Sequence, residues 1–567
     1  MPETGVQNLK ARYVFPVLGP PIPDGVIGIS GDRIISVGKE ALSGPIQDLG
    51  QVALLPGLIN AHTHLEFSHL ERPIGEPGIS FSQWARLLVE QFRQPSPTQR
   101  NPNPAAPLWK DQPLEPDSLG AQRVGSTEVR PFGSLPSHST DQAVPVAVGF
   151  PEHPLSGAEF ALRVGIVELL RGGATSVADI AQPGFSPAFW THLGMKAMVF
   201  LELRGPTQRR VAHALQQAQE YVEAWLAVVS GKPLPEGSRA AYCRAPSAFA
   251  PIPVTRQAEG WPASPTVGRG EQPLPHPGLP AVWPICPQER SRDVPESAEV
   301  ASQAGCPPNE TDQTQPGICW QLGLSPHAPY TVRPELLEAA VVLAQKYRLP
   351  LAMHLAESLE EMQFLQTGRG PLRRLLEDLG QWEPGLVQSP QRPLDYLQQL
   401  AQADRVLVIH GNYLQEEEWA FLAAHRERMV VVFCPRSHAH FGHRPYPLLQ
   451  MLGWGVRVIL GTDSRASAPD GNMLAELRHV ATRFPSLPPQ RILELATLES
   501  AQALGWGEEL GALVPGRRAD IVAVALPEQT GVSDPYELIF HSNQPVTAAW
   551  IAGQKVFSAS ADPSLPS

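Results

Sequence analysis

Two histidines at positions i and i+2 follow an apolar run within residues 54–66. At the end of a β-strand, His62 and His64 would point the same way, because successive side chains alternate across a strand. Neutral imidazole is the commonest side-chain ligand of metal ions, so such a pair could bind one ion. A His-x-His pair also occurs on solvated strands, and only further ligands would make this one a metal site.

Four more residues suited to metal binding or proton transfer stand at the ends of strand-like runs. They are His327 after 322–325, His354 at the end of 349–354, His410 at the end of 405–410, and Asp463 after 456–460. Each alone has a structural explanation, such as a hydrogen-bonded histidine or a helix-capping aspartate. In one parallel barrel, however, the C-terminal strand ends share the face on which catalytic groups lie.

On that face, three imidazoles and one carboxylate would surround one point: His62, His64, His354 and Asp463. This set suits a single Zn²⁺ or Fe²⁺ ion, with a position left for water. The run at 322–327 contains no lysine that could bridge two ions. We therefore expect one divalent ion as the cofactor.

The elements that position these residues predict an α/β fold. Eight strand-like runs, from 54–59 to 456–460, are mostly followed by helical patterns such as 208–229 and 472–482, which indicates a (β/α)8 barrel of the TIM type. Short strands and turns dominate the two ends of the chain. We expect a small β-sandwich built from both chain ends, residues 1–57 and 509–560, and a barrel that carries the metal site over residues 58–508.

Two segments, 94–152 and 231–316, are rich in Pro, Gly, Ser and Gln and show little apolar periodicity. The chain has 62 prolines in 567 residues, about twice the usual share of roughly 5%. We interpret both segments as disordered insertions in barrel loops. Lids or partner-docking arms are the alternative.

The composition narrows the class of partner. A formal net charge of −12 argues against binding nucleic acid or an anionic membrane through bulk charge, and favours a small-molecule substrate. Five cysteines without C-x-x-C spacing, no apolar leader and no membrane-length apolar run favour a cytoplasmic protein. A homo-oligomer is compatible with the sequence.

Several motifs occur together and in order: PGLINAHTH at 56–64, SPHAPYT at 325–331, HLAE at 354–357, HG at 410–411 and GTDS at 461–464. In these motifs the chain resembles the amidohydrolase superfamily, in its cytosine deaminase and chlorohydrolase-like branch. The likeness covers nearly everything outside the two insertions. HTHLE at 62–66 and CPRSH at 434–438 are most similar to aminodeoxyfutalosine deaminase-like members.

The resemblance implies that the four residues named above bind the metal and that Glu357 transfers protons. A divalent ion lowers the pKa of water from about 15.7 to about 7. Asp463 could then take a proton from the attacking water, while Glu357 protonates a ring nitrogen and helps ammonia to leave. His410 would hydrogen-bond the developing charge.

The expected substrate contacts are His327, Glu66 and Arg436, with a structural hydrogen bond as the alternative for Glu66. One departure from the branch is His438, which stands where many members have asparagine. His440 and His443 follow it, and this loop would line the substrate or, as a weaker alternative, form a second metal site.

We expect a metal-dependent amidohydrolase that acts on C–N bonds other than peptide bonds. The predicted reaction is hydrolytic deamination of an amino-substituted heterocycle, purine nucleoside-like in its chemistry. The alternatives are hydrolysis of another C–N or C–Cl bond on a heterocycle, as in a chlorohydrolase or amide hydrolase, and a catalytically inactive binding protein.

Overall fold

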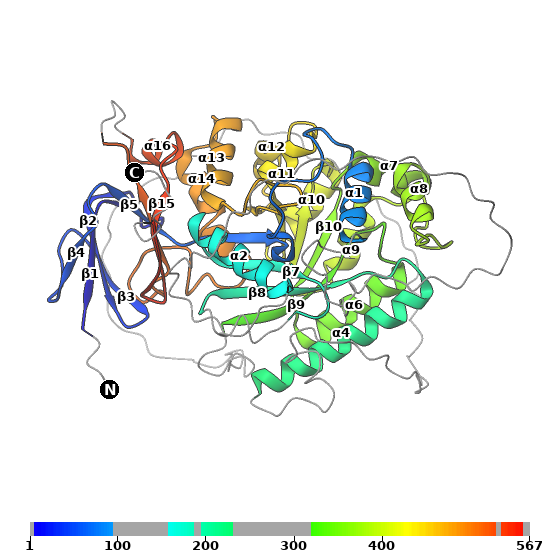
Figure 1. Cartoon of the computed structure of the whole chain (residues 1–567), viewed down its shortest axis with the longest axis horizontal. Helices are drawn as coiled ribbons and strands as arrows, with labels where there is room; N and C mark the ends of the chain where they lie inside the picture. The colour runs from blue at the N-terminus through cyan, green and yellow to red at the C-terminus, as the bar shows by residue number, and fades with distance from the viewer. Residues whose placement is uncertain (1–4, 94–156, 186–193, 231–318, 529–533, 560–567) are drawn as a thin grey trace, which may run out of the picture. The chain divides into compact units, whose positions relative to one another are not determined.

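The computed structural model describes residues 5–93, 157–185, 194–230, 319–528 and 534–559 (Figure 1). The expected insertions at 94–152 and 231–316 lie outside these ranges, and the domain boundaries stay predictions. Within the described residues the strands form two sheets of eight strands each. Among the described helices, none combines the length and apolar character needed to cross a bilayer.

One sheet is the expected barrel, and all its strand pairs are parallel. Its strands are mostly buried, which explains their nearly continuous apolar sequences. Neighbours in the sheet follow one another in the chain. The strands are β6 (Leu58–Thr63), β7 (Ala174–Ala181), β8 (Lys196–Leu203), β9 (Trp320–Pro326), β10 (Leu351–Leu355), β11 (Val406–His410), β12 (Met429–Phe433) and β13 (Val458–Leu460).

The first and last barrel strands are joined at their C-terminal ends. The backbone N–H groups of Thr462 and Asp463 both donate to the carbonyl of His62, at 3.1 and 3.0 Å. A side chain at Gly461 would not fit here, since its Cβ would lie 2.8 Å from the His62 nitrogen. The expectation of a (β/α)8 barrel is therefore confirmed.

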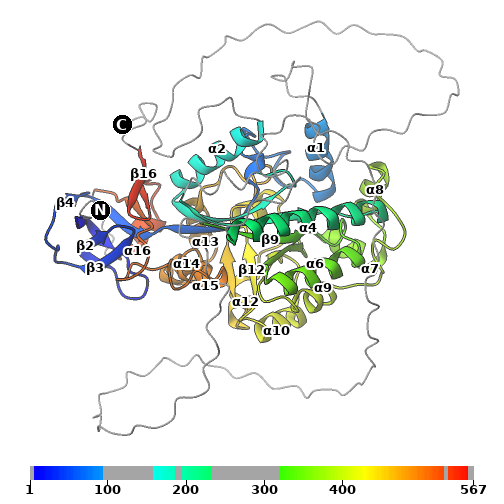
Figure 2. The ribbon, with the colours of Figure 1, turned by 90° about the horizontal axis from the view of Figure 1, so that it is seen from below.

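Helices surround the barrel strands (Figure 2). The helix expected at 472–482 is α13, and its N-cap Asn472 accepts a hydrogen bond from the backbone of Ala475 at 3.0 Å. The helices between and after the strands are α2 (Gly157–Arg171), α4 (Gln208–Val229), α6 (Pro334–Tyr347), α7 (Leu359–Thr367), α8 (Pro371–Asp378), α9 (Pro393–Leu400), α10 (Glu416–Ala424), α12 (Leu448–Gly453), α13 (Met473–Arg483), α14 (Pro489–Leu495) and α15 (Leu498–Ala503).

Three short elements follow barrel strands at their C-terminal ends. The 3₁₀ helix η1 (Leu65–Phe67) and helix α1 (Phe81–Arg93) come after β6, and helix α11 (Pro435–His440) comes after β12. The ring of Phe81 contacts the ring of Phe441, with centroids 5.8 Å apart. The loops after β6 and β12 therefore pack together beside the strand ends.

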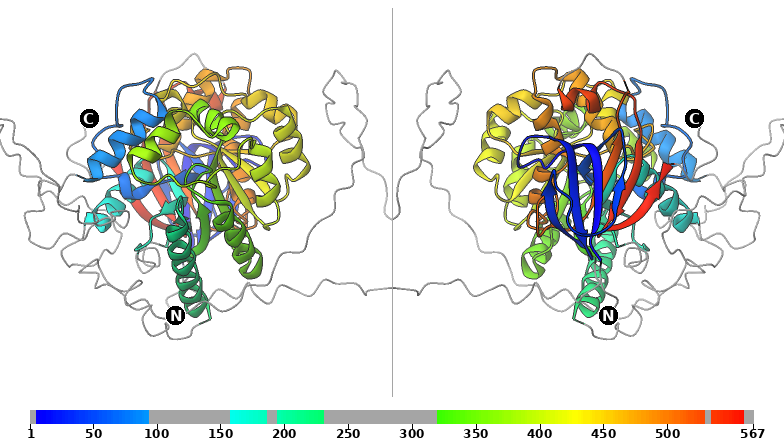
Figure 3. Two further views of the ribbon diagram at one scale, coloured as in Figure 1. Left: turned by 90° about the vertical axis from the view of Figure 1, so that its right-hand side faces the viewer. Right: turned by 90° about the vertical axis from the view of Figure 1, so that its left-hand side faces the viewer.

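The second sheet is built from both ends of the chain. Strand β14 pairs antiparallel with β5, so strands from the two ends of the chain lie side by side in one sheet (Figure 3). Helix α16 (Pro535–Phe540) lies between two of its strands in the sequence. The strands are β1 (Gln7–Val14), β2 (Ile22–Ser30), β3 (Arg33–Gly38), β4 (Ile46–Asp48), β5 (Val52–Pro56), β14 (Ile521–Ala525), β15 (Val546–Ile551) and β16 (Gln554–Ser558).

The single strand expected at 54–59 is wrong in one respect. The chain breaks at Gly57, so that β5 belongs to the second sheet and β6 to the barrel. The Gly57 N–H donates to the carbonyl of Asp520 at 2.9 Å instead of to a barrel strand. A Cβ at Gly57 would collide with the side chain of Thr175, which explains the glycine at this crossing.

Candidate metal centre

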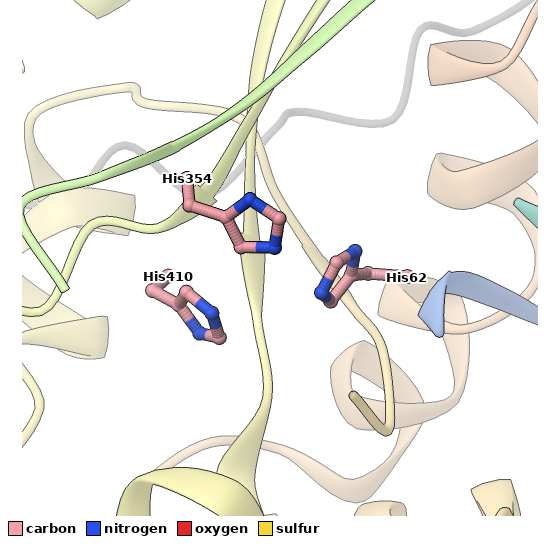
Figure 4. Close-up of side chains that lie close together, drawn as sticks. All are labelled: His62, His354 and His410. Carbon is pink, nitrogen blue, oxygen red and sulfur yellow. The ribbon is translucent and has the colours of Figure 1, made fainter. Parts of the chain in front are cut away.

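The strand ends bring five side chains of metal-binding type together. The possible ligand atoms of His62, His64 and Asp463 lie within 4.8 Å of one another, and so do those of His62, His354 and His410. Figure 4 shows the rings of the second group directed toward a common space. All four ligands expected from the sequence thus lie in one cluster, and His410 adds a fourth imidazole to it.

The donor atoms converge closely. The Nε2 atoms of His64 and His354 are 3.3 Å apart, and Asp463 Oδ1 lies 3.6 Å from His62 Nε2 and 4.0 Å from His64 Nε2. All four side chains are buried, with residue exposures of 0 to 8%. Both ring nitrogens of His62, and Nδ1 of His64, find no hydrogen-bond partner among the described residues. Buried polar atoms normally have a partner, so this set of donors fits a divalent ion such as Zn²⁺ or Fe²⁺.

The protonation states also suit a metal. Burial, followed by the charges of neighbouring histidines, lowers the pKa of His354 to about 3 and that of His64 well below its usual value. Both rings are therefore neutral at pH 7, which is the form that binds metal ions. Burial raises the pKa of Asp463, but the adjacent rings of His62 and His410 outweigh it and hold this pKa well below its usual range.

The backbone is strained where it presents two of these residues. His410 has a φ of 69° and Asp463 a φ of 61°, both in the left-handed region that disfavours side chains. Such strain costs about 1–3 kcal/mol per residue and persists only where the surroundings enforce it. Part of the enforcement is visible at His410, whose carbonyl accepts a hydrogen bond from the buried hydroxyl of Tyr446 at 2.9 Å.

Two serines orient the carboxylate of Asp463. Ser437 Oγ and Ser467 Oγ donate to Asp463 Oδ2 at 2.8 and 2.6 Å, and both serines are buried. The backbone N–H of Ser464 donates to Oδ1 at 2.7 Å. With Oδ2 fixed by the serines, Oδ1 is the oxygen turned toward His62 and His64. Partners of this kind hold a ligand in the geometry that the metal requires.

The ring of His354 is oriented by the backbone just after the preceding strand, β9. Its Nδ1 lies 3.0 Å from the carbonyl oxygen of His327, an acceptor, so Nδ1 carries the hydrogen. The unprotonated Nε2 therefore faces His64 and the centre of the cluster. This arrangement fixes the tautomer that a metal ligand needs.

Glu357 lies beside the cluster, three residues after His354. Its side chain is buried, and its Oε1 is 3.4 Å from His410 Nε2. Burial, and then the charges of Asp463 and Glu361, raise the pKa of Glu357 well above its usual value. Its backbone is held by Asn412, whose Nδ2 donates to the Glu357 carbonyl at 2.8 Å. The position and the raised pKa both suit proton transfer.

Glu361 supports the turn that carries Glu357, and sequence reasoning missed it. It is fully buried, and its two carboxylate oxygens accept the N–H groups of Ala356 and Glu357 at 2.9 and 2.8 Å. Ala356 has a φ of 54°, so the turn is strained. The available signal was a second glutamate four residues after Glu357, which the sequence alone could not distinguish from a solvated helix residue.

Of the expected substrate contacts, His327 and Glu66 lie near the cluster. The His327 ring is 5.1 Å from the His354 ring, centroid to centroid. Glu66 lies on η1, two residues after His64, and one of its oxygens is buried without a hydrogen-bond partner among the described residues. Burial and the charge of Glu202 raise the pKa of Glu66 to about 8.

Arg436 has a different environment from the one expected. Its Nε is 2.6 Å from Glu476 Oε1 and its Nη2 is 2.6 Å from Asp470 Oδ1, and Nη2 also donates to the carbonyl of Asn472. The guanidinium is thus occupied by ion pairs that hold α11 against the start of α13. A contact between Arg436 and the substrate stays a prediction, and any such contact would have to compete with these ion pairs.

The three histidines around α11 do not form a second metal site within the described part of the chain, since none belongs to a group of converging ligands. His440 Nε2 lies 3.1 Å from the carbonyl oxygen of Ile74, which ties α11 to the loop after β6. His443 Nδ1 lies 3.0 Å from the hydroxyl of Tyr413. His438 packs against the rings of Phe433 and Tyr446.

Three further polar residues at strand ends were missed. Asp179 in β7, Glu202 in β8 and Arg204 after β8 all lie near Glu66, whose pKa responds to their charges. Asp179 Oδ1 accepts the N–H of Leu65 at 2.9 Å. The rule that functional groups stand at the C-terminal ends of barrel strands would have found Asp179 and Glu202.

Comparison with known proteins shows which family this chain is similar to. Residues 298–556 match the amidohydrolase family. The chain is 33% identical over 208 residues to a 5-methylthioadenosine/S-adenosylhomocysteine deaminase of Desulforamulus reducens, which covers 35% of this chain and 43% of the relative. It is also 34% identical over 203 residues to an aminodeoxyfutalosine deaminase of Deinococcus radiodurans. This alignment covers 34% of the present chain and 47% of the relative. The chain thus spans somewhat less than half the length of these relatives.

Among solved structures, an adenosine deaminase from Xanthomonas campestris with bound zinc has a TM-score of 0.58. The alignment covers 100% of this chain and 96% of that chain at 20% identity, so the likeness concerns the fold. The matched residues and the two relatives thus make this chain similar to the amidohydrolase family, and its parallel barrel is the fold of the solved structure.

Proposed function

We propose that the protein is a metal-dependent deaminase that hydrolyses the amino group from a purine nucleoside-like heterocycle. The observation that carries this proposal is the buried carboxyl of Glu357, 3.4 Å from His410 and adjacent to the metal-binding cluster. Burial raises its pKa, which favours the protonated form that a proton donor needs. An amino group leaves readily as ammonia only after it gains a proton, whereas chloride leaves without one. The names of the two relatives, both deaminases of nucleoside-like compounds, agree with this choice.

We propose that His62, His64, His354 and Asp463 bind one divalent ion, Zn²⁺ or Fe²⁺. Such an ion lowers the pKa of water to about 7 and so supplies a nucleophile at neutral pH. Asp463 Oδ1 faces this position and is available to take a proton from the attacking water. Because the two serines hold Oδ2, the carboxylate does not rotate away as it accepts the proton.

The remaining roles follow from position. Glu357 gives its proton to a ring nitrogen as the tetrahedral carbon forms. The proton that Asp463 took from the water goes to the leaving amine, and the hydroxyl left on the carbon returns a proton to Glu357 as the C=O bond forms. His410 lies between Glu357 and the cluster and stabilises charge that develops on the oxygen. His327 contacts the substrate from the end of β9.

The test is a combination of metal analysis and ammonia release. We expect about one equivalent of Zn or Fe per chain, and ammonia release from at least one member of a panel of aminopurines, adenosine-like nucleosides, cytosine and triazines. Hydrolysis of amides or chlorinated rings with no amino heterocycle turned over would refute deamination. Less than half an equivalent of metal, with no activity after metal is added, would instead indicate a binding protein.

Replacing the proton donor gives a sharper test. Glu357→Gln keeps the shape of the side chain but cannot transfer a proton, so turnover should fall by about 10²–10⁴-fold while metal content stays the same. The matched control is Glu427→Gln, which makes the same change at an exposed position and should leave turnover unchanged. Equal turnover in the two variants would remove Glu357 from the mechanism.

A further inference from the structure

A second polar cluster, formed by Glu202, Arg204 and His327, lies next to the metal-binding residues. Ligand atoms of Glu202, His327 and His354 lie within 4.8 Å of one another. The Glu202 side chain is fully buried, and its Oε2 is 2.8 Å from Arg204 Nη2. Gln182 Nε2 donates to the same oxygen. One oxygen of this carboxylate is therefore well satisfied.

The other oxygen of Glu202 has no hydrogen-bond partner within the described residues. Its neighbour is His327 Nε2, at 3.7 Å, which is beyond hydrogen-bond length. A buried carboxylate oxygen left in this state is costly, and a donor that reaches it recovers that cost. This oxygen therefore points to a ligand.

The hydrogen bonds of His327 indicate that it is also an acceptor toward Glu202. Its Nδ1 is 2.5 Å from Thr331 Oγ1, and that hydroxyl donates to the carbonyl of Ala328 at 3.2 Å. Because the single hydroxyl hydrogen of Thr331 is used there, Nδ1 of His327 carries the hydrogen, and the neutral ring accepts at Nε2. Two acceptors thus face each other across 3.7 Å.

A metal ion is a poor candidate for this gap. The Arg204 guanidinium lies against the Glu202 carboxylate and neutralises its charge. His354 cannot contribute a second nitrogen, because its Nδ1 is paired with the carbonyl of His327. Glu202 Oε1 and His327 Nε2 can therefore accept hydrogen bonds from an uncharged group. They lie next to the position that the reacting ring of the substrate would take.

We propose that Glu202 Oε1 and His327 Nε2 together bind a pair of hydrogen-bond donors on the substrate, and that Glu202 thereby determines specificity. The donors come from one of two sources, the vicinal hydroxyls of a sugar or an amino group on the ring. This inference rests on the proposed deaminase function, since it concerns the same site.

The experiment measures binding in the Glu357→Gln background, where the ligand stays intact. The zinc-loaded protein is titrated by calorimetry with adenosine, 2′,3′-dideoxyadenosine and 2-aminoadenosine, with and without Glu202→Gln. In Glu202→Gln the amide oxygen keeps the contact to Arg204. The NH2 group of the same amide then replaces Oε1 and faces the substrate donors, with which it cannot form hydrogen bonds. The matched control is Asp520→Asn, which alters another buried carboxylate paired with an arginine, Arg518 at 3.0 Å.

If the sugar supplies the donors, adenosine should bind about 10- to 100-fold more tightly than the dideoxy compound, and Glu202→Gln should abolish this preference. If the ring supplies them, the preference for 2-aminoadenosine over adenosine should disappear in the same way. The Asp520→Asn control should keep either preference. Preferences that do not depend on Glu202, or no binding of any of the three ligands, would overturn the proposal.

Two further measurements separate the possible failures. Glu202→Asp keeps the charge beside Arg204 but withdraws the free oxygen, so it should weaken the preference even if the Gln variant does not fold. Ammonia release by protein with Glu357 intact is measured in parallel. Its absence with all three nucleosides would refute the deaminase function for them, whereas the calorimetry alone decides the role of Glu202.

Discussion

The two serines behind Asp463 allow a quantitative test of the metal centre. We predict that Ser437→Ala weakens zinc binding about tenfold, and that the double variant with Ser467→Ala weakens it about 100-fold. Each hydroxyl donates to the ionised Asp463 Oδ2, at 2.8 and 2.6 Å, and bonds to charged groups contribute about 1.5–3 kcal/mol. Loss of one such partner typically costs 10- to 100-fold in metal affinity. The two serines also contact each other at 3.0 Å, so their effects need not add.

The assay is competition between the chelator-stripped protein and a zinc-binding dye, with the melting temperature of the metal-free form as the check on folding. The control is Ser500→Ala, which removes another buried hydroxyl, one that donates to the carbonyl of Leu495 at 2.7 Å. This control should bind zinc as the unaltered protein does. If the double variant is well folded and binds zinc within twofold of the unaltered protein, Asp463 is not a ligand oriented by these serines.

Three other changes test the surrounding structure. Gly461→Ala should lower the free energy of unfolding by about 1–3 kcal/mol, because its Cβ would lie 2.8 Å from the nitrogen of His62; an unchanged urea midpoint would contradict this contact. Glu361→Gln should reduce turnover at least tenfold with the metal content unchanged, since one N–H of the turn at Glu357 loses its acceptor; equal kcat values would exclude this positioning role. Burial raises the pKa of Asp179 from 3.8 to about 8, so in the metal-free protein its contribution to stability is complete below about pH 4 and is lost as the pH rises through 8. The difference in melting temperature, Asp179→Asn minus the unaltered protein, should therefore increase between pH 5 and pH 8. A difference that stays constant over this range would refute the raised pKa of Asp179.

The barrel and the clustering of its histidines could be predicted because each signal is local. A histidine that ends an apolar strand is placed by its own strand, as His62 and His354 are, and the parallel topology then brings the strand ends together. Strand β8 shows the limit of this reasoning. Its apolar run stops at Leu201, but the strand continues to Leu203, because Glu202 is buried as an ion pair with Arg204. A polar residue that would normally mark a strand end is here part of the interior.

Contacts between distant loops were beyond the reach of the sequence. Ser437 meets Asp463 from 26 residues away, and Arg436 meets Glu476 from 40 residues away. Nothing near Arg436 in the sequence reveals that its charge is already paired. The ion pairs with Glu476 and Asp470 hold α11 against the start of α13, and only the fold reveals them.

The junction between the first and last barrel strands has a consequence for the order of events during synthesis. Thr63 Oγ1 donates to the carbonyl of Asp463, a contact between residues 400 positions apart. At about 5–20 residues per second, the ribosome would add Asp463 roughly 20–80 seconds after Thr63. His62 and His64 would wait through that interval without their carboxylate partner. Tight metal binding would therefore begin only after the barrel has closed. A chain stalled before the last barrel strand would not retain the ion.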